Sequence, residues 1–260
     1  MRTLRLIGVH LKITMLNEAQ YRVNFFLSLF QSMITMGTGL LVLTLVFSWV
    51  SELNGWSRPE LLILLGVFTA LGGMVRMVFK PNVKQFIDDV REGTLDYVLT
   101  KPVDGQLLVS IRTLQLWQGV DILTGAVLVG VGLSQMHRVG LVESMMFAGA
   151  LLLGSVMIYS LLMMLGTTAF WFVQSHQIME FFDGIWQAGR WPVGIYPRWL
   201  QVGLTLVVPI GFSVTAPAQA ITSRLSGTSL LVMAALSALL FALARWYWRF
   251  GLRRYTGASA

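Results

Sequence analysis

The side chains that could carry chemistry are few and scattered in this sequence. It has no Cys, and its three His stand far apart, so no cluster has the spacing of a zinc or haem site. A phosphate-binding loop needs a Lys followed by Ser or Thr, whose hydroxyl holds magnesium. Ile, Pro or Gln follows each of the four lysines, Lys12, Lys80, Lys84 and Lys101. The chain therefore carries no ATPase loop, and we expect it to bind no metal or cofactor itself.

Asp121 is the carboxylate that an apolar run encloses most clearly. Counted along a helix from Gln106, it lies roughly 22 Å into a membrane span. A charge there must face a cavity, find a partner or be protonated. Gln118 lies one turn earlier, and Gln31 stands among small and polar residues of the first apolar run. These three residues are candidates for a substrate path. The alternative is that they join helices by hydrogen bonds.

An intramembrane enzyme is disfavoured by the same inventory. No Gly-x-Ser-x-Gly run exists for a serine nucleophile, and a two-aspartate site needs a second carboxylate beside Asp121 at membrane depth. We therefore expect no catalytic residues. An ion-coupled secondary carrier that uses Asp121 is the alternative function.

The composition identifies an integral membrane protein. Hydrophobic residues make up 55% of the 260 and charged residues only 12%, which is about half the charged share of ordinary soluble domains. The formal charge of +7 lies in short segments between apolar runs. That pattern is typical of membrane topology and not of nucleic-acid binding.

Apolar runs of about 20 residues set the expected all-α architecture, since that length spans the bilayer core. The runs are 23–51, 61–79 (if Arg76 snorkels), 107–135, 144–179 and 225–244. The fourth run is long enough for one helix and the entry to a fifth. In 180–224 the spaced prolines do not suit one straight helix. Either a fifth span covers 176–193 and a re-entrant hairpin follows, which we favour, or 199–223 is itself the span.

Both alternatives give six spans with the termini on one side of the membrane. Most of the 19 Lys and Arg residues lie in the N-terminal segment, in the connection after the second span and in the C-terminal tail. By the positive-inside rule these parts are cytoplasmic. Residues 1–22 place basic and apolar side chains on different faces, which predicts an amphipathic helix on the membrane surface.

The polar connection 80–105 predicts a short amphipathic helix that begins at Asn82. Its apolar residues recur at helical spacing, and Gly93 suits the left-handed position that ends a helix. Such a face either packs on the ends of the chain's own spans or docks a cytoplasmic partner. We interpret the segment as a docking helix whose contact residues are Val83, Phe86, Ile87, Val90, Arg91, Glu92 and Gly93.

Two runs carry a resemblance to a known family. The run REGTLDYVLTKPVD, residues 91–104, resembles a stretch typical of type 2 ABC exporter permeases, in the subfamily long catalogued as a domain of unknown function. The run RWPVGIYPRWL, residues 190–200, followed by VVPI at 207–210, is similar to the same family.

The resemblance implies a single permease domain over 1–260 in a bacterial cytoplasmic (inner) membrane. It implies a second permease, identical or homologous, and separate ATP-binding subunits that hold ATP and magnesium. The loop 80–105 would then be the coupling helix. Residues 190–224 would form a re-entrant outer gate, with Pro192, Tyr196, Pro197 and Pro209 as candidate gate residues.

Overall fold

The computed structural model describes residues 22–136, 139–172 and 176–255, and this part of the chain is all-helical, without strands. Five helices are long and apolar enough to cross a membrane: α2 (Arg22–Trp49, apolar from Phe25), the continuous helix Arg58–Glu92, Leu116–Ser134 with α7 (Gly119–Ser134), α8 (Leu141–Thr167) with the turn to Phe170, and α12 (Gly227–Leu252). A bent pair, Arg198–Val207 and Ile210–Ile221, brings the number to six if it counts as one span. The multi-pass membrane class is thereby supported.

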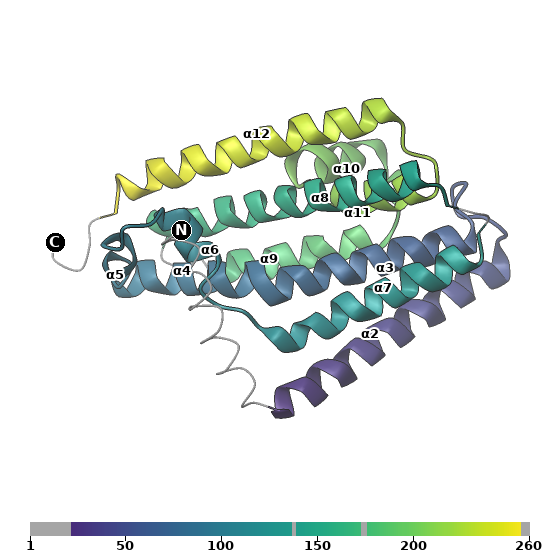
Figure 1. Ribbon diagram of the computed structural model, residues 1–260, viewed down its shortest axis with the longest axis horizontal. Coiled ribbons are helices and arrows are strands. Elements are labelled where there is room, and N and C mark those ends of the chain that lie inside the picture. The colour runs from purple at the N-terminus through teal and green to yellow at the C-terminus, as the bar shows by residue number, and fades with distance from the viewer. Residues whose placement is uncertain (1–21, 137–138, 173–175, 256–260) are drawn as a thin grey trace.

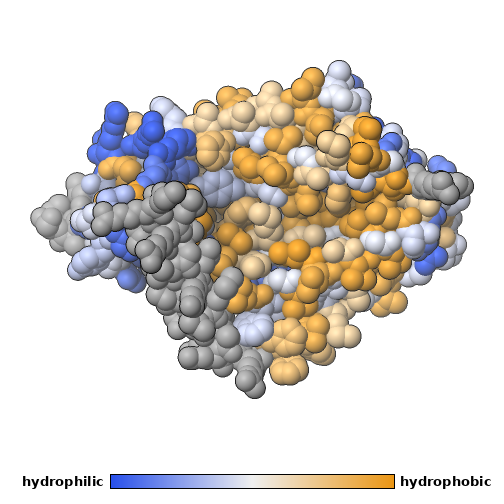
Figure 2. All heavy atoms as spheres, in the orientation of Figure 1, coloured by the Kyte–Doolittle hydropathy of each residue, from blue (hydrophilic) through white to orange (hydrophobic). Residues whose placement is uncertain are grey.

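The long helices lie side by side in one bundle (Figure 1). α3 (Arg58–Met74) packs along α7, and α8 lies between α11 (Ile210–Ile221) and α12. α2 lies at one margin beside α7 (Figure 1). Apolar side chains cover the middle of the visible face, and hydrophilic ones gather toward its two ends (Figure 2). This distribution suits a bundle whose middle contacts lipid.

Glycines bring α3 and α7 into backbone contact. A Cβ added at Gly125 would lie 2.5 Å from the Gly66 carbonyl oxygen and 2.5 Å from the Ala70 nitrogen. A Cβ at Gly73 would lie 2.8 Å from the Ile122 nitrogen. In lipid there is no hydrophobic driving force between helices, so close van der Waals packing must hold them together. Small residues allow this close approach.

The second span continues without a break into the segment expected to be a separate helix. α3, the π-helical turn η1 (Val75–Phe79) and α4 (Lys80–Glu92) form one helix of 35 residues. The prediction that a helix begins at Asn82 is therefore wrong: the helix runs through this residue. Gly93 does end it, with φ 71° in the left-handed region.

The third span is shorter than its apolar run suggested. Residues 105–118 form α6 (Gly105–Ser110), an irregular stretch and the 3-10 turn Leu116–Gln118, and α7 begins only at Gly119. α5 (Asp96–Leu99) precedes them. Asp121 thus lies in the first turn of α7, and the continuous helix from Gln106 on which the 22 Å estimate rested does not form.

Between α9 (His176–Trp186) and α12 the chain forms a bent hairpin. α10 (Arg198–Val202) and the π turn Gly203–Val207 meet α11 at 91°. A Cβ on Gly194, just before α10, would lie 2.8 Å from the Asn54 side chain. Arg224, just after α11, hydrogen-bonds to Gly55. Both ends of the hairpin therefore reach the same connection, residues 50–57. The amphipathic helix expected in 1–22 lies outside the described residues, apart from Arg22.

Candidate functional site

We name the two ends of the bundle by what they carry. The charged end holds α4, α5, α6 and the last turns of α12. The hairpin end holds the connection 50–57, the segment 192–198 and the turn 221–227. In Figure 1 these are the left and right ends, respectively. The candidate functional residues fall into three groups, one at each end and one between.

At the charged end, the apolar face of α4 is covered by the chain itself. Phe86 and Ile87 are 0% exposed and Val83 is 3% exposed. The Phe86 ring packs against Trp248 of α12, with centroids 4.9 Å apart, and against Phe170 after α8, at 5.5 Å. The expectation that these three side chains dock a partner is therefore corrected: they hold α4 onto α8 and α12.

What remains available at the charged end is the opposite, polar face. Arg91 and Glu92 are exposed, Val90 and Gly93 are partly buried, and Tyr97 of α5 is 77% exposed. Beside them is a cavity of about 440 Å³ lined by Asp88, Val90, Arg91, Glu92, Ala169, Phe170, Arg254 and Tyr255. A concave surface with both charge signs can receive a polar segment of another protein.

Buried polar contacts fix α4 to the segment after it. Asp89 is 5% exposed, and its carboxylate accepts a hydrogen bond from Arg112, with a separation of 2.5 Å. Asn82 donates to the Thr113 carbonyl at 2.7 Å and accepts from the Thr113 amide at 2.8 Å. These contacts satisfy the groups that burial would otherwise make costly. Arg112 thus belongs to this junction.

A second set of polar contacts ties α6 to α12. Asp104 caps the start of α6 by accepting a hydrogen bond from the Leu107 amide at 3.1 Å. Its carboxylate also pairs with Arg245 of α12, and that guanidinium donates to Gln106 at 2.9 Å. The hydrogen bond from Arg245 lowers the pKa of the Asp104 carboxyl below its ordinary value of 3.8, because it favours the charged form. The charged end is therefore one connected unit.

Asp121 finds a partner in Arg76 of the π turn η1. The Arg76 guanidinium donates to one carboxylate oxygen of Asp121 through two nitrogens, at 2.6 and 3.2 Å. Asp121 is 8% exposed, whereas Gln118 is partly buried and Gln31 is exposed on α2. The three candidate path residues do not form one lining. The sequence left three alternatives for this charge: it faces a cavity, finds a partner or is protonated. The structure shows that it is paired with Arg76.

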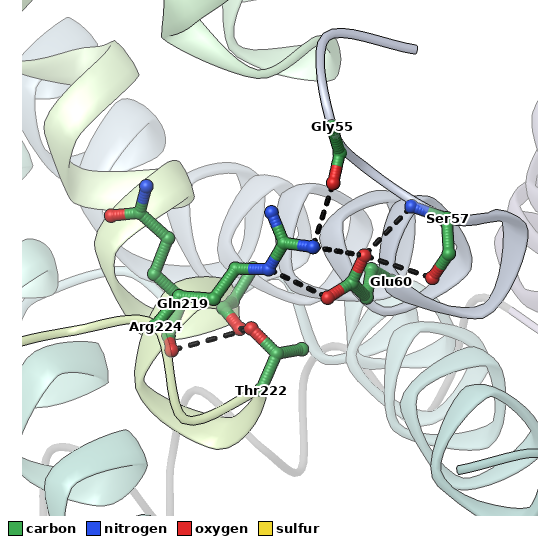
Figure 3. Close-up of polar contacts among 7 residues, drawn as sticks. Gly55, Ser57, Glu60, Gln219, Thr222 and Arg224 are labelled. Carbon is green, nitrogen blue, oxygen red and sulfur yellow. Dashed lines mark hydrogen bonds and ion pairs between the residues drawn. The ribbon is translucent and has the colours of Figure 1, made fainter. Parts of the chain in front are cut away.

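At the hairpin end, Glu60 lies at the centre of a polar cluster that the sequence analysis did not single out (Figure 3). Glu60 is 5% exposed. Its carboxylate accepts hydrogen bonds from the Ser57 amide at 2.7 Å and from the Ser57 hydroxyl at 2.8 Å. Arg224 donates to both carboxylate oxygens, at 2.7 and 2.8 Å, and to the Gly55 carbonyl. This bidentate pair joins the start of α3 to the end of the hairpin.

The candidate gate residues all lie in or beside the hairpin. Pro192 and Pro209 are buried, and Pro209 stands at the 91° bend directly before α11. Tyr196 donates from its hydroxyl to the Ala188 carbonyl at 2.9 Å, and Pro197 precedes α10. The prolines mark turns and helix starts, as their fixed φ and missing amide hydrogen require. The candidate gate residues thus lie where the hairpin turns or where a helix begins.

No carboxylate cluster suitable for a metal ion occurs among the described residues. The groups at both ends join helices, and nothing in their arrangement resembles a nucleophile with its base.

Comparison with known proteins gives a family match. A family model described as ABC-2 family transporter protein matches residues 33–259, which is most of the chain. No curated protein and no solved structure gives a significant match.

Proposed function

Since the chain belongs to the ABC-2 family of transporter proteins, we propose that it is the permease subunit of an ATP-driven exporter. It would form the translocation path with a second permease, identical or homologous. Separate cytoplasmic ATP-binding subunits would supply ATP hydrolysis. The family match does not favour the secondary carrier, and the Arg76 pairing of Asp121 gives that alternative no support.

One observation carries the proposal: a single helix connects the hairpin end with the charged end. Its 35 residues, Arg58–Glu92, extend about 52 Å at 1.5 Å per residue. The hydrocarbon core is about 30 Å thick, so about 20 residues cross it and α4 projects beyond. Glu60 fastens one end of this helix to the hairpin, and Asp89 fastens the other to Arg112. A force applied to α4 by a partner therefore acts on the same helix that contacts the hairpin.

The charged end is cytoplasmic in this proposal. It holds α4 to α6 and the basic end of α12, and the positive-inside rule assigns such segments to the cytoplasm of a bacterial inner membrane. Six crossings follow if α9 and the turns after it carry the chain to the hairpin end. The pair α10–α11 would then be a re-entrant gate, because both of its ends reach the connection 50–57.

The surface for the ATP-binding subunit would be the exposed side of α4 and α5 with the adjoining cavity. Arg91, Glu92 and Tyr97 are exposed members of this surface. Tyr and Arg are the residue types that most often contribute strongly at protein interfaces. The coupling role thus stays with the segment 80–105, but moves from its buried apolar face to its exposed face.

The test is a triple variant, Arg91→Ala, Glu92→Ala and Tyr97→Ala, expressed with its ATP-binding subunit. We expect the affinity between the subunits to fall at least tenfold, since one central aromatic contact contributes about 2 kcal/mol. The matched control is Trp199→Ala, which removes an aromatic side chain that is 75% exposed at the hairpin end. Co-purification and ATP hydrolysis would be measured. Unchanged binding in the triple variant would contradict the assignment.

A further inference from the structure

Arg190 differs from the other arginines that the structure places within the bundle. Arg76, Arg112, Arg224 and Arg245 each pair with a carboxylate. Arg190 has no carboxylate partner among the described residues, and its Nε is buried without a hydrogen-bond acceptor. Its guanidinium lies over the Phe68 ring, 5.7 Å from the centroid. Arg190 is partly buried as a residue. The cation–π contact offsets part of the cost of burying Nε but supplies no hydrogen-bond acceptor for it.

A cavity of about 190 Å³ lies beside Arg190, between α2 and α3. It is lined by Gly39, Val42, Leu43, Leu61, Leu65, Arg190 and Trp191. Apart from Arg190, the lining side chains are apolar, and the indole nitrogen of Trp191 is their single polar atom. The cavity therefore combines one cation with apolar walls, which is the arrangement that an anionic headgroup with an attached acyl chain requires.

The position of the cavity along the helices agrees with this chemistry. Leu61 and Leu65 lie about 5 to 10 Å along α3 from its first residue, Arg58. Val42 lies about 10 Å from the last residue of α2, Trp49. With the ends of α2 and α3 at the membrane surface, the cavity would lie close to the boundary between headgroups and acyl chains. α2 itself exposes Leu41 and Leu45 at 70% and 64%, so an acyl chain leaving the cavity can continue along an apolar surface.

We propose that this cavity binds an anionic amphiphile, with its phosphate or carboxylate on Arg190 and its acyl chain along α2 and α3. A planar guanidinium donates to such oxygens through paired hydrogen bonds. A small soluble anion fits less well, because the remaining walls offer it no hydrogen-bond donor beyond the Trp191 indole. The inference concerns binding alone and does not depend on ATP-driven transport.

The test compares three probes on the purified permease: phosphatidylglycerol, phosphatidylcholine and inorganic phosphate. Native mass spectrometry would count bound lipid during titration in neutral detergent. We expect phosphatidylglycerol to bind at least tenfold more tightly than phosphatidylcholine, and Arg190→Gln to abolish that preference. Arg198→Gln, which removes an exposed arginine from the same end, should leave the preference intact.

A second variant keeps the test decisive if Arg190→Gln does not fold. Val42→Trp fills the cavity while the charge stays, and it should also remove the bound phosphatidylglycerol. Equal binding of both lipids by the natural chain, or full preference in both variants, would overturn the proposal. Displacement of the lipid by inorganic phosphate at the same concentration would identify a free-anion site instead. Loss of a permease dimer in Arg190→Gln without any lipid effect would show that a second copy supplies the missing acceptor.

Discussion

Phe86→Ala separates the two functions that a buried apolar face on α4 could have. The side chain is 0% exposed and lies between Trp248 and Phe170, at ring-centroid distances of 4.9 and 5.5 Å. Removing a buried Phe ring costs about 3 to 5 kcal/mol, including the cavity that it leaves. For a chain of this length each kcal/mol lowers the melting temperature by about 2 to 4 °C, so the expected decrease is about 6 to 20 °C.

The assay is thermal unfolding of the purified permease in detergent, without its partner. Tyr97→Ala is the matched control, because this ring is 77% exposed on the neighbouring helix α5. It should change the free energy of unfolding by no more than about 0.5 kcal/mol. A Phe86→Ala variant with an unchanged melting temperature but weakened partner binding would refute the packing described here. It would restore the docking role that the sequence pattern first indicated.

Three further predictions follow from the helix contacts. Gly125→Ala should destabilise the α3–α7 crossing by about 1 to 3 kcal/mol, because its Cβ would meet backbone atoms at 2.5 Å. The control is Gly130→Ala, whose Cβ would meet nothing within 4 Å and which should not destabilise the crossing. Thermal unfolding would compare the two variants. Asp104→Asn should lose the stability that comes with the lowered pKa of this carboxyl. The loss of unfolding free energy relative to the natural chain should be complete above pH 3.8 and should vanish as the pH falls through the lowered pKa. Unfolding measured across this pH range would test it. Asp121→Asn should weaken the contact with the π turn and lower the free energy of unfolding by about 1 to 3 kcal/mol, while ATP-dependent transport persists. Transport that is driven by a proton gradient without ATP, and that is lost in this variant, would instead support the secondary carrier.

The sequence predicted the helices well where the cause was local. Apolar runs of membrane length located the long spans, and the glycine at 93 ended its helix at the expected residue because left-handed backbone favours glycine. The junction after the second span was not predictable in this way. Asn82 follows a charged residue and a proline, and its side chain can cap a helix, so a helix start was expected there. In the structure the π turn, closed by the Lys80 amide on the Val75 carbonyl, precedes Pro81 and the helix continues.

Contacts between residues far apart in the sequence could not be predicted from local sequence patterns. Arg76 and Asp121 are 45 residues apart, and Glu60 and Arg224 are 164 apart. No local spacing links such pairs, because only the bundle brings them together. The same limit applied to Phe86: its periodicity correctly indicated a buried face, but periodicity does not tell whether the covering surface belongs to the same chain or to a partner.

Site-directed cross-linking tests the central claim most directly, because the chain has no Cys of its own. Tyr97→Cys and Trp199→Cys, both at strongly exposed positions but at opposite ends of the bundle, would be labelled with a maleimide photo-cross-linker in membranes that contain the ATP-binding subunit. The proposed function predicts a cross-link to that subunit from position 97 and none from position 199. A cross-link from 199 alone, or from neither position while the complex remains assembled, would contradict the assignment of the charged end as the site of coupling.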